Sequence, residues 1–182
     1  MIPPQAEAAT INFSSGTYFS SLPNGLSSQP FNSYVEGGFT FQTPQASGQH
    51  LDANNQVLYW HEGGANTVNN IITLTYASGA FNLLSFDLVE IPNNFPTFNP
   101  AMTITGSNGS QFFTGNEAVG TFNLGWTDLA WVTFDINGQG NIGGNAWMDN
   151  VTVQAVPAYE PGTFALLLAS IGVLGGARRL RN

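Results

Sequence analysis

Residues 70–90 read NIITLTYASGAFNLLSFDLVE, and this stretch decides the fold class. In its first half, Ile72, Leu74 and Tyr76 fall on one face of an extended chain, because strand side chains alternate with a period of two. The two threonines between them fall on the opposite face. One apolar face and one polar face predict a half-buried β-strand.

The same stretch continues through Ser78-Gly79, a turn signal, into a second strand at Phe81–Glu90. Further turn signals, Asn108-Gly109 and Asn137-Gly138, separate other short apolar runs. The other predicted strands are Thr10–Phe13, Phe39–Thr43, Val57–Trp60, Asn70–Tyr76, Ala101–Ser107, Gln111–Thr114, Ala118–Leu124, Leu129–Ile136 and Trp147–Gln154. No window before residue 160 has a helical period. We therefore expect residues 10–155 to form an all-β domain, an antiparallel two-sheet β-sandwich of jelly-roll-like type.

Charge is distributed very unevenly along the 182 residues. The three basic residues are Arg178, Arg179 and Arg181, so residues 1–177 hold all 11 acidic residues and no Lys or Arg. A domain without cations cannot follow a phosphate backbone, which excludes nucleic-acid binding by the usual electrostatic route. Charged residues are 8% of the chain, against about 25% in an ordinary domain, so the surface is built from amides and hydroxyls. Without Cys, disulfides and thiolate sites are excluded as well.

Residues 1–9, MIPPQAEAA, have no apolar run. Ala6-Glu7-Ala8 fits the small-x-small pattern at the end of a secretory signal. The segment is predicted to be either the remnant of a signal peptide or a flexible N-terminus.

Residues 156–182 differ from the rest of the chain. A Pro-containing hinge leads into an uncharged apolar run from Thr163 to Ala177, and the arginine cluster follows. Fifteen helical residues span roughly 22 Å at about 1.5 Å each. The hydrocarbon core of a bilayer is about 30 Å thick, so the predicted helix is shorter than the core. Arginine side chains that snorkel to the membrane surface reduce this difference in length. The pattern predicts a single C-terminal membrane helix with Arg178, Arg179 and Arg181 as the topology anchor.

This tail resembles the PEP-CTERM sorting signal of Gram-negative bacteria, which is also labelled an ice-binding protein C-terminal domain. The resemblance is carried by Glu160, Pro161 and Gly162, then by the Leu- and Gly-rich run, then by the Arg-rich end. Tyr159 stands where the family motif has its first proline.

The resemblance implies export, anchoring in the inner membrane, and processing near Glu160 by an exosortase. The arginines would remain cytoplasmic, in agreement with the positive-inside rule. The resemblance also implies a destination at the cell surface or in an extracellular polysaccharide matrix. The β-domain resembles the sandwich domains that precede such tails, through residues 10–13, 72–75, 81–87 and 148–153.

Catalytic motifs are sparse. His50 and the His61-Glu62 pair are the imidazole candidates, and no Gly-x-Ser-x-Gly nucleophile elbow accompanies them. Paired carboxylates could hydrolyse a glycoside, but sequence spacing alone brings no two of them together. The carboxylates considered are Asp87, Glu90, Asp128 and Asp135. We expect a protein that is not an enzyme, with no catalytic residue and no cofactor, and a secreted glycoside-type hydrolase as the second alternative.

Calcium is the metal considered, because hard cations take carboxylate and carbonyl oxygens. Asp149, in the last predicted strand, is the candidate ligand of a structural calcium ion. The alternative is that Asp149 caps a turn or accepts hydrogen bonds from backbone amides.

Carbohydrate binding is the first alternative function. Exposed aromatic rings provide flat platforms for sugars. Trp60, beside His61, and Trp126, after a turn glycine, are the candidates. Trp131 and Trp147 lie in apolar strand runs and are expected in the core. The main expectation is an exported, non-enzymatic surface or matrix protein, sorted through its tail, with exosortase, the membrane and extracellular polysaccharide as partners.

Overall fold

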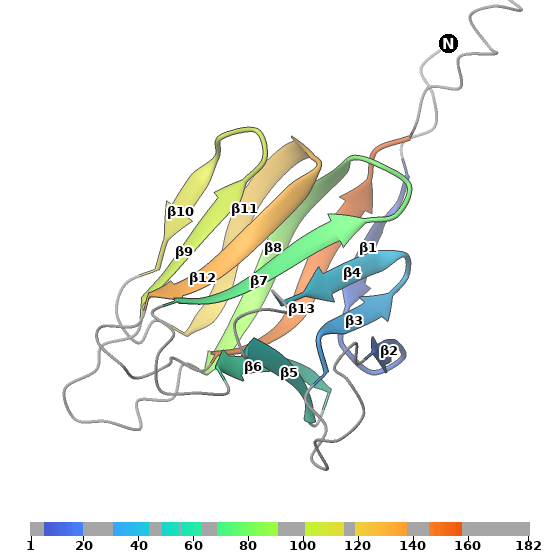
Figure 1. The fold of residues 1–182 in the computed structure, drawn as a ribbon. Helices are drawn as coiled ribbons and strands as arrows, with labels where there is room; N and C mark the ends of the chain where they lie inside the picture. Colours follow the sequence, from blue (N-terminus) through green and yellow to red (C-terminus); the bar gives the residue numbers. More distant parts are fainter. Residues whose placement is uncertain are drawn as a thin grey trace, which may run out of the picture.

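The computed structural model describes residues 6–19, 31–43, 49–54, 56–62, 69–90, 101–114, 119–137 and 146–157. These residues form thirteen strands in two antiparallel sheets, which confirms the prediction of an all-β, two-sheet sandwich (Figure 1). No helix in these ranges is long and apolar enough to cross a membrane.

The seven-stranded sheet has the order β10-β9-β12-β7-β4-β3-β2 and lies toward the viewer in Figure 1. Its strands are β2 (Thr17–Phe19), β3 (Ser33–Glu36), β4 (Phe39–Gln42), β7 (Asn69–Tyr76), β9 (Ala101–Gly106), β10 (Gln111–Phe113) and β12 (Trp131–Asn137). Residues 70–90, which decide the fold class, supply β7 at the centre of this sheet. The chain then turns at Ser78-Gly79 and enters the other sheet.

The six-stranded sheet has the order β11-β8-β13-β6-β5, and β1 pairs with β13 beside β6. Its strands are β1 (Ala8–Ile11), β5 (Gln49–Asn54), β6 (Val57–Glu62), β8 (Phe81–Glu90), β11 (Gly120–Leu129) and β13 (Ala146–Ala155). Because Ala8 is paired with Gln154, the two strands that begin and end the described domain leave it at the same end (Figure 1).

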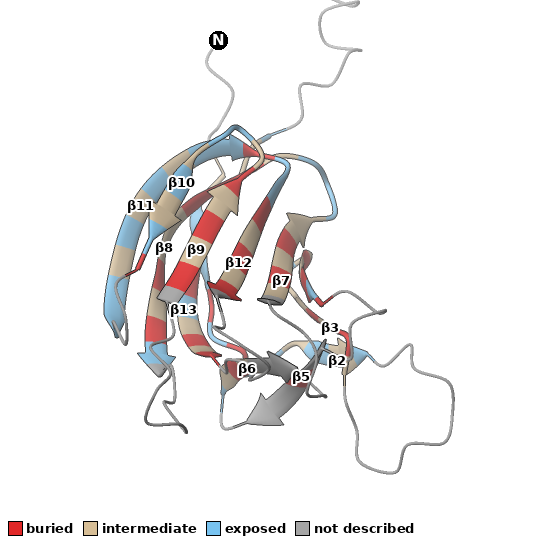
Figure 2. Ribbon diagram, turned by 60° about the vertical axis from the view of Figure 1, so that its left-hand side comes forward, coloured by how far each residue is buried: buried red, intermediate tan, exposed pale blue. Residues whose placement is uncertain are grey.

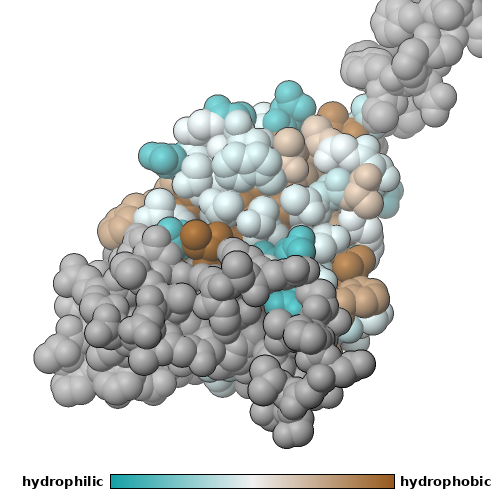
Figure 3. Space-filling view, in the orientation of Figure 1, coloured by the Kyte–Doolittle hydropathy of each residue, from teal (hydrophilic) through white to brown (hydrophobic). Residues whose placement is uncertain are grey.

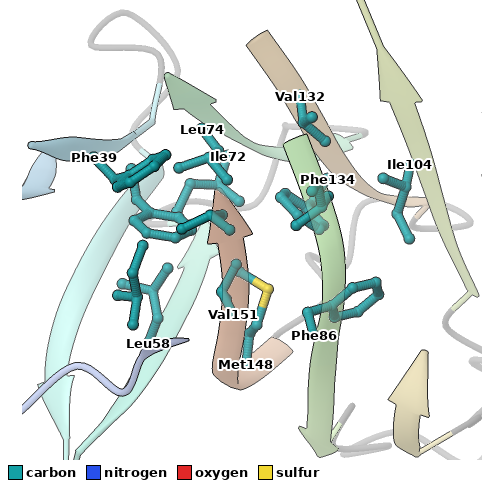
Figure 4. Close-up of a cluster of buried hydrophobic side chains, with 14 of the residues drawn as sticks. Phe39, Leu58, Ile72, Leu74, Phe86, Ile104, Val132, Phe134, Met148 and Val151 are labelled. Atoms are coloured by element: carbon teal, nitrogen blue, oxygen red, sulfur yellow. The ribbon is translucent and has the colours of Figure 1, made fainter. Parts of the chain in front are cut away.

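The core lies between the two sheets and is filled from alternating positions of each strand. Along β12, Val132, Phe134 and Ile136 are fully buried and the residues between them are not. Figure 2 shows the same banding of buried and partly exposed residues on β7 and β9. Across the interface, the rings of Phe86 and Phe134 meet edge to face at 5.4 Å. Figure 4 shows how such side chains from both sheets interlock.

Several strand predictions are confirmed and others were incomplete. Phe81–Glu90 has the predicted bounds, and β7 begins one residue earlier than predicted. β2, β3 and β5 were not predicted from the sequence. One predicted strand ended at Leu124, whereas β11 continues to Leu129 through two shifts of register.

Within the segment at residues 1–9, the described residues begin at Ala6, whose carbonyl accepts a 2.7 Å hydrogen bond from the Gln154 side chain, and β1 begins at Ala8. The sorting motif, the apolar run and the arginines predicted in the tail lie outside the described residues.

Candidate functional site

The outer face of the seven-stranded sheet carries an exposed indole among uncharged polar side chains. Because Val132, Phe134 and Ile136 point inward, Trp131 and Thr133 point outward from β12. In the neighbouring strands, Trp131 is paired with Thr75, and Thr133 lies between Thr73 and Thr105. Figure 3 shows this face, and its described part is mostly pale, the colour of intermediate hydropathy.

Trp131 is 39% exposed, so the expectation that it fills the core is wrong. The strand prediction was correct. The error was to place every apolar residue of this strand in the core, although alternate residues of a strand face opposite sides. With a period of two, the buried set at residues 132, 134 and 136 places Trp131 on the other face. That alternation was the signal in the sequence that could have identified it.

Trp126, predicted to be an exposed sugar platform, is instead half-buried and packs against the core. It lies over Gly106, where an added Cβ would come within 3.2 Å of the Trp126 ring. The chain bulges around this residue, with Gly125 at a φ of +62° and Asp128 at +57°. Trp126 falls in phase with Phe122 and Leu124, which also pack against the core, so the strand continues through Gly125 and its indole lies on the inner face.

The other predicted candidates lie on β6 and β13. The backbone of Trp60 lies opposite Ala146, and its side chain falls outside the described set. Trp147 is half-buried on the outer face of the six-stranded sheet, where its ring meets Tyr59 edge to face at 5.4 Å. Trp147 was expected in the core, and this expectation is wrong. Its side chain is partly exposed to solvent.

Asp135 occupies the same outer face as Trp131, four residues along β12. Burial raises the pKa of its carboxyl above the ordinary value. One of its oxygens is buried and has no hydrogen-bond partner among the described residues. This carboxylate marks the end of the uncharged part of the face.

Two carboxylates meet on the outer face of the six-stranded sheet. Asp149 of β13 lies directly opposite Asp87 of β8. Asp87 accepts hydrogen bonds from the Thr121 hydroxyl at 2.6 Å and from the Asn150 side-chain amide at 2.8 Å. Asp149 accepts one from the backbone amide of Asn150 at 2.7 Å. Both acids were candidates from the sequence, but only the register of the sheet brings them together.

The pKa of Asp149 is raised, first by burial and then by the negative charges of Asp87 and Glu36, while the Asn150 amide acts in the opposite direction. Glu36 is itself engaged, because its two oxygens accept hydrogen bonds from Ser15 and Tyr34. The described carboxylates around Asp149 thus all accept hydrogen bonds from other residues of the fold.

Calcium binding at Asp149 stays a prediction. Within the described ranges, no group of three or more His, Cys, Asp or Glu side chains could hold a metal ion. The second reading of Asp149, as an acceptor for a backbone amide, is the one observed at Asn150.

The imidazole candidates are neighbours in the backbone. His50 of β5 is paired with His61 of β6, and their side chains lie outside the described set. The structure therefore adds no catalytic geometry to these residues.

No family model matches the chain, and no curated protein matches it. Among solved structures, a mutant of CBM29-2, a family 29 carbohydrate binding module, has 15% identity over 82% of this chain and 92% of its own, with a TM-score of 0.46. Another family 29 module has 14% identity, covers 83% and 89%, and has the same TM-score. The agarase AgWH50C has 12% identity over 86% of this chain and 26% of its own, at a TM-score of 0.43.

Identities this low transfer neither a ligand nor a site residue. The fold defines the chain as an antiparallel β-sandwich.

Proposed function

We propose that this chain is a non-catalytic protein that binds a neutral polysaccharide on the outer face of its seven-stranded sheet. The observation that carries the proposal is the exposed indole of Trp131 beside the hydroxyl-bearing side chains of Thr75 and Thr133. A flat aromatic ring packs against the apolar face of a sugar, and neighbouring hydroxyls supply directional hydrogen bonds.

Charge supports a neutral ligand. Residues 1–155 contain ten acidic residues and no Lys or Arg, so a uronate, sulfate or phosphate group would find no cationic partner there. The same negative domain would repel an acidic polysaccharide at low ionic strength. A chain of uncharged sugars needs no cationic partner and is not repelled by the acidic residues.

We propose binding without catalysis because Asp87 and Asp149, the two carboxylates that the sheet brings together, accept hydrogen bonds from neighbouring residues of the same sheet. A glycosidase needs one carboxyl to donate a proton and the other to act as a base or nucleophile across the scissile bond. Both carboxylates are held by Asn150, Asp87 through its side-chain amide and Asp149 through its backbone amide, so they are poorly placed for those roles.

Native gel electrophoresis tests this function. The full chain is run through gels that contain hydroxyethylcellulose, galactomannan, xylan or agarose, and through gels with alginate or polygalacturonate. We expect retardation by at least one neutral polymer and by neither acidic one. Trp131→Ala should weaken that affinity by about tenfold through loss of the stacked ring.

Trp147→Phe is the matched control, because it changes an aromatic residue on the opposite sheet and keeps a ring against Tyr59. It should migrate like the wild type. Unchanged retardation of Trp131→Ala, or no retardation in any neutral gel, would refute the proposed function.

We also propose that the tail directs export and sorting. The support is the order of Glu160-Pro161-Gly162, the apolar run Thr163 to Ala177, and the arginines. Their resemblance to a PEP-CTERM signal makes an exosortase the partner and the cell surface or polysaccharide matrix the destination. β13 ends at Ala155, opposite Phe81, so the tail would tether the domain at the end of the sandwich where the turn between β7 and β8 lies.

Mass spectrometry of the surface-exposed protein tests sorting. In an exosortase-containing Gram-negative host, the C-terminus should lie near Glu160. A host lacking exosortase should retain the full chain in its inner membrane. A surface form that still ends at Asn182 would refute the processing step.

A further inference from the structure

Two rows of side chains cross the strands on the outer face of the seven-stranded sheet, and together they are named the hydroxyl band. The upper row consists of Trp131, Thr75 and Thr40, on β12, β7 and β4. The lower row consists of Thr105, Thr133, Thr73, Gln42 and Ser33, on β9, β12, β7, β4 and β3. Apart from the indole, every member presents a hydroxyl or an amide.

The band is continuous across the strands and is interrupted along β12 and β7. Along β12, the sequence of outward residues passes from Thr133 to Asp135, a partly buried carboxylate. Along β7, it passes from Thr73 to Ile71, which has no polar side-chain atom. Uncharged hydrogen-bonding groups therefore extend furthest at right angles to the strands.

The hydroxyls of the lower row are available to a ligand. Thr73, Thr105 and Thr133 are partly exposed, and within the described part of the chain none of their hydroxyls has a hydrogen-bond partner. This differs from Thr10 and Thr152 on the opposite sheet, whose hydroxyls are 3.4 Å apart.

Resting on the proposed function, we infer that the polysaccharide lies across the strands along the hydroxyl band, with one sugar ring on Trp131. The lower row spans four strand spacings, or roughly 19 Å at about 4.8 Å each. One pyranose unit of an extended polysaccharide has nearly the length of one spacing. The band thus provides about four subsites, one for each pair of neighbouring strands from β9 to β3.

Calorimetry with neutral oligosaccharides of known length tests this arrangement. The full chain is titrated with cello-, manno-, xylo- and malto-oligosaccharides of two to six units. For the series that binds, affinity should rise up to about four units and then level off. Thr73→Val and Thr133→Val, which keep the branched shape and remove the hydroxyl, should each weaken the four-unit ligand by about two- to tenfold.

Thr152→Val on the six-stranded sheet is the matched control and should leave the affinity unchanged. Asp135→Asn should also have little effect, because it lies beyond the band. If affinity is already maximal at two units, or if Asp135→Asn weakens binding more than Thr73→Val does, the ligand does not cross the strands. In that case a loss of binding in Trp131→Ala would still uphold the proposed function. Failure of every series to bind overturns this inference.

Discussion

The backbone amide of Gly16 donates a 2.9 Å hydrogen bond to the hydroxyl of Tyr34, and the two residues touch so closely that Gly16 has no room for a Cβ. An added Cβ would lie 2.3 Å from the Tyr34 ring and 2.5 Å from the Val35 carbonyl oxygen. Gly16 directly precedes β2, and β2 pairs with β3, the strand that carries Tyr34. This contact therefore holds the start of the edge strand β2 against its neighbour in the seven-stranded sheet.

Gly16→Ala should destabilise the fold. Both groups that the new methyl would meet are held in place, one as a fully buried ring and the other as backbone of β3. Overpacking of this kind costs about 1–3 kcal/mol, and urea denaturation would measure the loss in the free energy of unfolding. Ser15→Ala, one residue away and exposed, should change it by less than about 1 kcal/mol. Equal effects of the two substitutions would contradict the steric argument.

Tyr34→Phe should destabilise the fold for a different reason. The ring remains, but the amide of Gly16 loses its acceptor and Glu36 loses a donor. Burial holds the pKa of Tyr34 well above its usual range, so the phenol is protonated and able to donate. Leaving such partners unsatisfied costs about 1–3 kcal/mol in the free energy of unfolding.

Tyr76→Phe serves as the comparison, because Tyr76 stacks on Phe39 at 4.5 Å through its ring. Thermal denaturation should show a clearly lower Tm for Tyr34→Phe than for Tyr76→Phe. A Tm equal to that of the wild type for Tyr34→Phe would show that the hydroxyl contributes nothing.

Alternation in the sequence was enough to predict the sheets, but not every strand in them. β7 and β8 are long and have regular apolar faces, so their period is unambiguous. β2 has three residues, too few for a period, and β5 has only Leu51 and Ala53 as apolar residues. Such strands are fixed by pairing with neighbours, a tertiary effect that a local pattern does not contain.

The site residues were harder to predict, because they depend on register. The sequence contains Thr73 and Thr133 sixty residues apart, and only the pairing of β7 with β12 places them side by side. The same holds for Asp87 and Asp149. Trp126 was misplaced because Gly125 was read as a turn, whereas positive φ values there produce bulges within a continuing strand.

Asn82→Ala should loosen the edge strand β11. Asn82 is nearly buried, its amide donates to the Gln154 side chain at 2.9 Å, and its oxygen accepts from the Asp128 amide at 3.0 Å. Asp128 has a φ of +57°, so this bond supports a strained bulge. The substitution should cost about 1–3 kcal/mol and speed hydrogen exchange in β11.

Asn123→Ala tests whether that effect is specific, since Asn123 is an exposed residue of the same strand. Its exchange rates in β11 should stay close to those of the wild type. Faster exchange spread evenly over both sheets in Asn82→Ala, with no excess in β11, would mean that the bulge does not depend on Asn82.

Asp149→Asn should stabilise the fold at neutral pH. Burial raises the pKa of Asp149 in the folded state, and the charges of Asp87 and Glu36 raise it further. In the unfolded chain an aspartate titrates near pH 3.9. Between these two values the folded state binds more protons than the unfolded state, so the stability contributed by Asp149 falls as the pH rises.

The sign of the pH dependence follows from this difference. At pH 7 the buried charge penalises the wild type, whereas the Asn side chain carries no charge and its oxygen can still accept from the Asn150 amide. As the pH falls through the raised pKa of Asp149, the carboxyl is protonated and the penalty disappears. The advantage of Asp149→Asn over the wild type, measured by urea denaturation from pH 7 to pH 4, should therefore shrink. An advantage that stays constant over this range would mean that the charge on Asp149 is not penalised in the fold.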